Sequence, residues 1–151
     1  MPMDIHSILT ASRTKAHVDG ISKKRVLETL ASVFADDISD FNVDELYQNL
    51  INREKLGTTG IGGGIAIPHC RFNTGGATYC ACLTLEKPID FDAVDNKPVD
   101  IIFAMLVPEN AESSHLEMLA KLAEMLQQPA FVQRLRDASS DAELYDIAVS
   151  Q

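Results

Sequence analysis

A glycine-rich apolar stretch that ends in a histidine is the feature of this 151-residue chain best suited to chemistry. Residues 60–69 read Gly-Ile-Gly-Gly-Gly-Ile-Ala-Ile-Pro-His. Proline holds the preceding residue extended and has no N–H to donate, so Pro68 predicts the end of a strand and places His69 at a sheet edge. The glycines lack Cβ atoms, so a phosphate or a partner surface can approach closely. The pattern predicts a nucleophilic His69; the competing interpretation is an ordinary polar side chain at a strand end.

A second histidine, His115, stands at a predicted helix start. The residues Ser114-His-Leu-Glu117 resemble a capping box, which predicts Ser114 as the N-cap and His115 as the first helical residue. Free backbone N–H groups and the positive end of the helix dipole favour a bound phosphate or carboxylate at such a place. A neutral His115 would donate to phosphate oxygens, whereas the alternative is a partly exposed histidine without a role.

The three cysteines, Cys70, Cys80 and Cys82, are expected to be reduced, partly buried thiols. A metal site that combines them with His69 is a weaker alternative, because the usual Cys-x-x-Cys spacing is missing. A Cys–His hydrolase that pairs Cys70 or Cys80 with His115 lacks a nucleophile-elbow signature. No metal is therefore predicted.

The chain matches neither of the two nucleotide-binding motifs, and its composition limits the classes of partner that it can bind. Ile65 stands where Gly-x-Gly-x-x-Gly needs its third glycine, and no P-loop Lys-Ser/Thr pair follows, so no cofactor is predicted. The net charge of −9 opposes binding to nucleic acid or anionic lipid, which leaves proteins or small molecules as partners. No apolar run is long enough for a membrane span and the N-terminus lacks a signal-peptide pattern, which predicts a cytoplasmic location.

The helices expected to position these residues follow from the spacing of apolar side chains. That spacing predicts one helix over 22–35 and a second from the N-cap Asn42 to a point before Gly57. A long helix follows His115 until Pro129 interrupts it. Two shorter helices are predicted over 131–137 and after the N-cap Ser140.

The strands lie between these two groups of helices. Apolar or alternating runs bounded by Gly, Pro and Asp-Asn predict strands over 60–67, 77–85 and 99–107. This order of elements predicts one domain over residues 1–151, an α/β sandwich with a central mixed β-sheet flanked by helices on both faces.

These motifs resemble the enzyme IIA proteins of the bacterial phosphoenolpyruvate-dependent phosphotransferase system, in the mannitol/fructose class, and most closely their nitrogen-regulatory branch. The resemblance covers the chain from about Ile21 to Ile147. Its specific parts are Arg53-Glu-Lys-Leu-Gly-Thr-Thr-Gly-Ile-Gly-Gly-Gly-Ile-Ala-Ile-Pro-His69, Asp95-Asn-Lys-Pro-Val-Asp100, and Leu106-Val-Pro through His115-Leu. The first of these stretches is highly specific.

The resemblance implies roles for four residues. His69 matches the histidine that accepts a phosphoryl group from a histidine-containing phosphocarrier protein and later releases it, and His115 matches the supporting histidine. Arg53 matches the arginine that neutralises phosphate oxygens, against the alternative of a helix-surface ion pair with Glu54 or with Asp-rich neighbours. Thr58 matches a small hydroxyl residue that adds a hydrogen bond. Neither ATP nor a metal is needed for such a transfer.

One residue departs from the family pattern, because Cys70 stands where the family usually has glycine. If this position requires a positive φ, Cys70 would be strained. Its thiol beside His69 is also hypothesised to make the site sensitive to oxidation.

The function that the resemblance implies is that of a phosphotransferase component, a phosphohistidine carrier whose phosphorylation state regulates partner proteins of the sensor kinase or potassium transporter type. One alternative is a sugar-specific IIA component that passes phosphate to a IIB domain for fructose or mannitol uptake. The other is a binding module in which phosphorylation is vestigial. His6 and His17 carry no motif and are assigned to structure or solvent.

Overall fold

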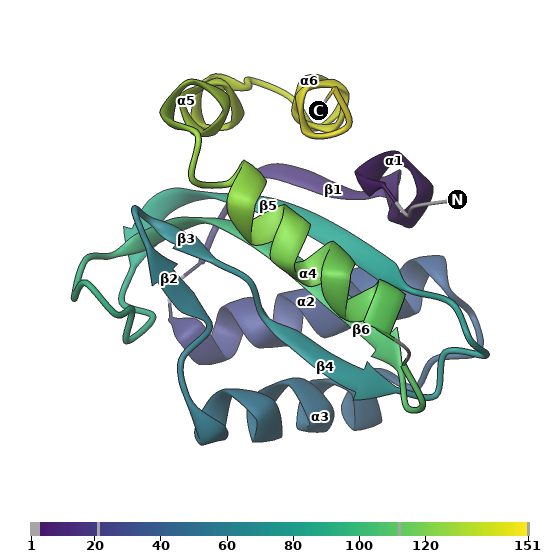
Figure 1. Ribbon diagram of the computed structural model, residues 1–151. Helices are drawn as coiled ribbons and strands as arrows, with labels where there is room; N and C mark the ends of the chain where they lie inside the picture. The colour runs from purple at the N-terminus through teal and green to yellow at the C-terminus, as the bar shows by residue number, and fades with distance from the viewer. Residues whose placement is uncertain (1–3, 21, 112, 151) are drawn as a thin grey trace.

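A mixed six-stranded sheet lies at the centre of the protein, with helices on both faces (Figure 1). The computed structural model describes residues 4–20, 22–111 and 113–150. The strand order is β1-β5-β6-β3-β2, and β4 also pairs with β6. The predicted fold class is confirmed. The elements are α1 (Ile5–Ile8), β1 (Leu9–Val18), α2 (Lys23–Asp37), α3 (Val43–Leu56), β2 (Gly60–Gly62), β3 (Ile65–Ala66), β4 (His69–Phe72), β5 (Tyr79–Ile89), β6 (Val99–Pro108), α4 (Ser113–Met125), α5 (Pro129–Asp137) and α6 (Asp141–Ala148).

The central strand β6 divides two hydrophobic layers. Alternate side chains such as Phe103 and Met105 pack toward α1, α4, α5 and α6, whereas Ala104 and Leu106 pack toward α2 and α3. Successive side chains of a strand point to opposite faces, and both faces of this sheet are covered. This explains why the sequence of β6 is an almost continuous apolar run.

Side-chain caps define the starts of α2, α3 and α6, and Asp4 caps the short α1 in the same way. The side chains of Ser22, Asn42 and Ser140 each accept a hydrogen bond from a backbone N–H in the first turn of α2, α3 and α6. The predicted caps Asn42 and Ser140 are thus confirmed. The prediction for α4 was wrong, because this helix begins at Ser113 and His115 is its third residue. The predicted capping bond of the Ser114 side chain lies outside the described part of the structure.

The glycine-rich stretch folds as a hairpin rather than as the single predicted strand. Strands β2 and β3 are antiparallel, and Gly62, Gly63 and Gly64 turn the chain with φ of +101°, +68° and +83°. Left-handed conformations of this kind are accessible mainly to glycine. The glycines therefore form a turn.

His69 begins a separate strand after this hairpin. Strand β4 runs parallel to β6, with His69 opposite Met105, and Pro68 accepts a hydrogen bond from the backbone of Met105 at 2.9 Å. Strand β3 ends before Pro68, as predicted, and a new strand of the same sheet begins at His69. Among the described strands β4 pairs with β6 alone, so His69 lies at a sheet edge.

The N-terminal elements α1 and β1 were not predicted. Strand β1 pairs with β5 through irregular register and has no clean alternation of buried side chains. Its buried Arg13 donates to the carbonyl oxygens of Cys80 and Ile8, at 2.9 and 2.8 Å, and pairs with Asp37. A buried charge inside the strand hides the apolar pattern that sequence reasoning depends on.

We expect Gly64→Ala to destabilise the hairpin turn. The φ of +83° strains an L-residue, and a Cβ at Gly64 would come within 3.0 Å of Asp100 Oδ1, beside the ion pair between Asp100 and Arg136. We predict that the free energy of unfolding falls by about 3 kcal/mol, measured by urea denaturation. Gly63→Ala is the matched control: its φ is also positive but its Cβ meets open space, so the loss should be about 1 kcal/mol. Equal losses in the two variants would contradict the steric part of this argument.

Candidate functional site

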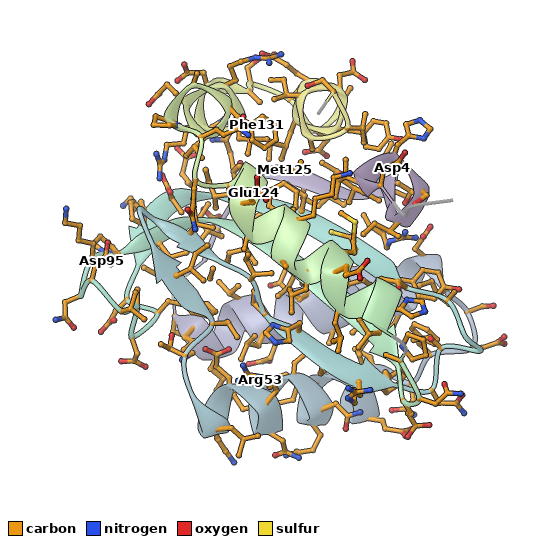
Figure 2. All side chains as sticks on the ribbon, in the orientation of Figure 1. Asp4, Arg53, Asp95, Glu124, Met125 and Phe131 are labelled. Carbon is orange, nitrogen blue, oxygen red and sulfur yellow. The ribbon has the colours of Figure 1, made fainter. Side chains whose placement is uncertain are left out.

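His69 faces a cleft of about 610 Å³ at the edge of the sheet. The cleft lies where β4 and the end of β6 meet α3 and α4, and Figure 2 labels Arg53 where α3 approaches the sheet. It is lined by Asn49, Asn52, Arg53, Leu56, His69, Cys70, Arg71, Val107, Leu116 and Leu119. The structure thus brings two of the predicted site residues, His69 and Arg53, to one cavity.

The orientation of the His69 ring shows which of its nitrogens carries the hydrogen. Nδ1 lies 2.8 Å from the backbone oxygen of Ile67. A carbonyl oxygen can only accept a hydrogen bond, so Nδ1 carries the hydrogen and donates it. In the neutral ring the lone pair is therefore on Nε2. The half-buried imidazole therefore offers a nitrogen lone pair without the help of a separate base.

The surroundings of His69 favour this neutral form. Burial of the ring lowers the pKa of His69 below its usual value of 6.5, and the positive charge of Arg53 lowers it further. The hydrogen bond to Ile67 acts in the opposite direction but does not outweigh burial. Because the pKa is lowered, the imidazole stays unprotonated as the pH falls through 6.5 and becomes charged only below that value.

We expect a histidine NMR titration to show this directly. The midpoint for His69 should lie below 6.5, and Arg53→Gln should move it upward because a neighbouring positive charge is lost. Lys55→Gln removes a positive charge from the same helix at an exposed position outside the cleft, and it should leave the midpoint nearly unchanged. A midpoint above 6.5 in the wild-type protein would show that burial does not control this ring.

Arg53 does not form the ion pair with Glu54 that was the alternative prediction. The buried Glu54 carboxylate pairs with Lys23 Nζ at 3.0 Å and accepts hydrogen bonds from the backbone N–H and the hydroxyl of Thr59. Arg53 Nη1 donates to the carbonyl oxygen of Gly57 at 3.0 Å, and within the described residues Arg53 has no carboxylate partner. Most of its N–H donors are available to an anion in the cleft.

Thr58 and His115 lie outside the set of side chains that line the cleft. The Thr58 hydroxyl donates to the carbonyl oxygen of Phe91 at 2.8 Å and accepts from the N–H of Gly60 at 3.0 Å. These bonds hold the start of the glycine hairpin, and a contact of Thr58 with phosphate stays a prediction. His115 sits on α4 near the cleft, and its Nδ1 is hydrogen-bonded to the Thr78 hydroxyl.

Sequence reasoning missed several residues of the cleft. Arg71 lies two residues after His69 in β4, so the two side chains leave the same face of the strand. Asn49, Asn52 and Arg53 share one face of α3 through helical spacing. Once a strand at 69–72 is recognised, the i, i+2 spacing of His69 and Arg71 is the signal that would have found the second arginine.

The rim of the cleft is unusually apolar. Leu56 is 85% exposed and Leu116 is 46% exposed, and both line the cavity that contains His69. Large apolar side chains that remain exposed around a polar centre are typical of interaction sites.

One expectation about Cys70 is overturned: its φ is not positive, so the predicted backbone strain does not occur. Burial raises the pKa of the Cys70 thiol to about 12, which disfavours the reactive thiolate. Sensitivity of the site to oxidation stays a prediction. The alternative metal site also fails, because Cys70 packs on the side of α2 and α3 whereas Cys80 and Cys82 pack on the opposite face of the sheet.

A comparison with known protein families identifies the family to which this fold belongs. A family model described as the phosphoenolpyruvate-dependent sugar phosphotransferase system, EIIA 2, matches residues 7–150. The chain belongs to this family, and the predicted resemblance is confirmed. Within residues 4–20, 22–111 and 113–150, no helix combines the length and apolarity needed to cross a membrane.

Within this family, the chain is similar to the nitrogen regulatory IIA proteins. The chain is 46% identical over 145 residues to the nitrogen regulatory protein of Pseudomonas aeruginosa, covering 96% of this chain and 94% of the relative. The crystal structure of nitrogen regulatory protein IIA-Ntr from Neisseria meningitidis matches with a TM-score of 0.87 and 38% identity, covering 95% of this chain and 98% of that one. The IIA mannitol structure from Escherichia coli shares the fold, with a TM-score of 0.74 at 17% identity over 92% of this chain and 97% of that one.

Proposed function

We propose that this protein is a cytoplasmic phosphohistidine carrier of the nitrogen-regulatory phosphotransferase system, in which His69 accepts a phosphoryl group from a histidine-containing phosphocarrier protein. The whole chain acts as one such domain. The observation that supports this most is the hydrogen bond from His69 Nδ1 to Ile67, because it leaves the lone pair of Nε2 free in a cleft that also holds Arg53. Membership of the family supplies the donor class.

The transfer follows from this geometry without further components. The lone pair of His69 Nε2 attacks the phosphorus of the donor phosphohistidine, and the donor's N–P bond breaks with its electron pair returning to the donor imidazole. No proton has to leave Nε2 before the attack, because in this tautomer the ring N–H is on Nδ1. A phosphorus–nitrogen bond is exchanged for another, so neither ATP nor a metal has to drive the step. The protein's task is to position the groups and neutralise the phosphoryl oxygens.

Two arginines are placed for that neutralisation. Arg53 from α3 and Arg71 from β4 line the same cleft as His69. A guanidinium offers several N–H donors in a planar fork, which suits the oxygens of a transferring phosphoryl group. His115 assists from α4, and Thr58 adds a hydrogen bond if its loop shifts.

The exposed leucines supply the docking surface in this scheme. A donor protein must bring its imidazole to His69, and Leu56 and Leu116 offer apolar area around the cleft for that contact. Phosphorylation then adds a charge of about −1.5 to −2 to this apolar surface. Such a change would alter the affinity for a regulated partner, of the sensor kinase or potassium transporter type, and make the protein a switch.

The test is transfer of labelled phosphate from phosphoenolpyruvate through enzyme I and the phosphocarrier protein to this chain. Acid-labile label on the wild-type protein is the expected result. A purified IIB domain is then added as a chase: label that stays on the chain supports the regulatory role, whereas rapid transfer to IIB favours the sugar-specific alternative. If a working donor leaves the wild-type protein unlabelled, a binding module with vestigial phosphorylation is the better account.

A further inference from the structure

The side chain of Thr78 makes a contact that the proposed transfer does not yet use. Thr78 precedes β5, its side chain is buried at 7% exposure, and its hydroxyl is hydrogen-bonded to Nδ1 of His115 in α4. The two residues come from separate elements, and the bond ties the half-buried imidazole of His115 to the sheet. Leu116 and Leu119 of the same helix line the cleft of His69.

The direction of this hydrogen bond follows from the chemistry of the hydroxyl. A threonine O–H can donate to a bare ring nitrogen or accept from a protonated one. Within the described residues, His115 Nδ1 is the partner that the structure gives to the Thr78 hydroxyl. If Thr78 accepted, its own buried hydrogen would be left unpaired, which is costly. If it donates, that hydrogen is satisfied and Nδ1 of His115 carries the lone pair.

We infer that Thr78 is a positioning residue that holds neutral His115 in the tautomer with its hydrogen on Nε2. This inference rests on the proposed function. In that tautomer the free side of the His115 ring donates a hydrogen bond, as a phosphoryl oxygen requires. The opposite tautomer would present a lone pair to the anion and repel it.

The two histidines are then held in complementary states by different partners. At His69 the carbonyl of Ile67 fixes the hydrogen on Nδ1 and leaves Nε2 as a nucleophile. At His115 the hydroxyl of Thr78 fixes the lone pair on Nδ1 and leaves Nε2 as a donor. In the proposed transfer, one ring attacks the phosphorus and the other donates to an oxygen of the same group, so each needs the tautomer that its partner selects.

The experiment measures the tautomer of His115 by ¹⁵N NMR of the full chain, at a pH where the ring is neutral. We expect Nε2 to show the shift of a protonated nitrogen in the wild-type protein and in Thr78→Ser, which keeps the hydroxyl. Thr78→Val keeps the shape but loses the donor, so the two nitrogens should move toward a mixed tautomer population. Thr74→Val is the matched control, because Thr74 donates to Ala77 in the preceding loop and does not contact His115.

Phosphoryl acceptance should follow the tautomer. We expect a fall of about 10-fold in the transfer rate for Thr78→Val, rescue in Thr78→Ser, and no change in Thr74→Val. A wild-type His115 with its hydrogen on Nδ1 overturns the inference, as does a Thr78→Val protein that keeps the wild-type shifts. The wild-type spectrum decides this even if Thr78→Val fails to fold. An absence of label on the wild-type chain would refute the proposed function and leave the tautomer result standing.

Discussion

Replacement of His69 by alanine is expected to abolish phosphoryl acceptance, with the rate of labelling falling by about 10³-fold or more. The variant loses the lone pair of Nε2, and neither arginine of the cleft can replace a nucleophile of this kind. The fold should survive, because His69 is a half-buried residue at a sheet edge and its side chain makes one hydrogen bond, to Ile67. Loss of that bond costs about 1 kcal/mol of folding free energy.

Two matched variants make this result specific. His69→Asn places an amide nitrogen near the position of Nδ1, where it can donate to Ile67, but it offers no nucleophilic nitrogen, so it should be as inactive as alanine. His6→Ala removes an exposed histidine on α1, far from the motif in sequence, and should be labelled like the wild-type protein. Acid-labile label that persists in His69→Ala would mean that another histidine, with His115 the first to test, is the acceptor.

Sequence reasoning succeeded where the signal is local. The N-caps Asn42 and Ser140, the long apolar strand β6 and the histidine after the glycines are all visible within a few residues. Each depends on backbone hydrogen bonds or periodicity that a short window contains. The family resemblance rested on the same local motifs.

The failures share a different cause, because they depend on contacts between distant segments. Strand β1 is stabilised by pairing with β5 and by the buried Arg13, and neither leaves a periodic pattern. The glycines were read as strand because three consecutive left-handed residues are a conformational choice that sequence permits but does not require. The bond between Thr78 and His115 joins two elements, and only the packing of α4 brings them together.

The residues of the cleft also depend on contacts between distant segments, which a sequence motif does not reveal. His69 and Arg53 belong to one sequence motif, but Arg71 enters the site only because β4 pairs with β6 and turns alternate residues toward the cleft. The apolar rim is likewise assembled from two helices, with Leu56 at the end of α3 and Leu116 in α4. A motif can name the proposed nucleophile, whereas the groups proposed to stabilise the transferred charge are brought together by tertiary structure.

The second large effect is expected from removing both arginines of the cleft. Arg53→Gln should slow phosphoryl acceptance about 100-fold and Arg71→Gln about 10-fold, since Arg71 is more exposed and its charge is screened by water. If the two guanidinium groups act on different oxygens, the double variant should lose about 10³-fold. The rate is measured by single-turnover transfer from the labelled phosphocarrier protein, with Lys55→Gln as the control for loss of one positive charge outside the cleft.

A further variant of Arg53 separates the contribution of its positive charge from that of its planar hydrogen-bonding geometry. Arg53→Lys keeps the positive charge but loses the planar fork, so it should recover only part of the rate if two hydrogen bonds to phosphate matter. Binding of the donor protein should weaken less than the transfer rate, because much of the docking surface is apolar and unchanged. A double variant that transfers phosphate at the wild-type rate would show that the arginines do not contact the transferred group. His69 would then have to react with neutralisation supplied by the donor protein alone.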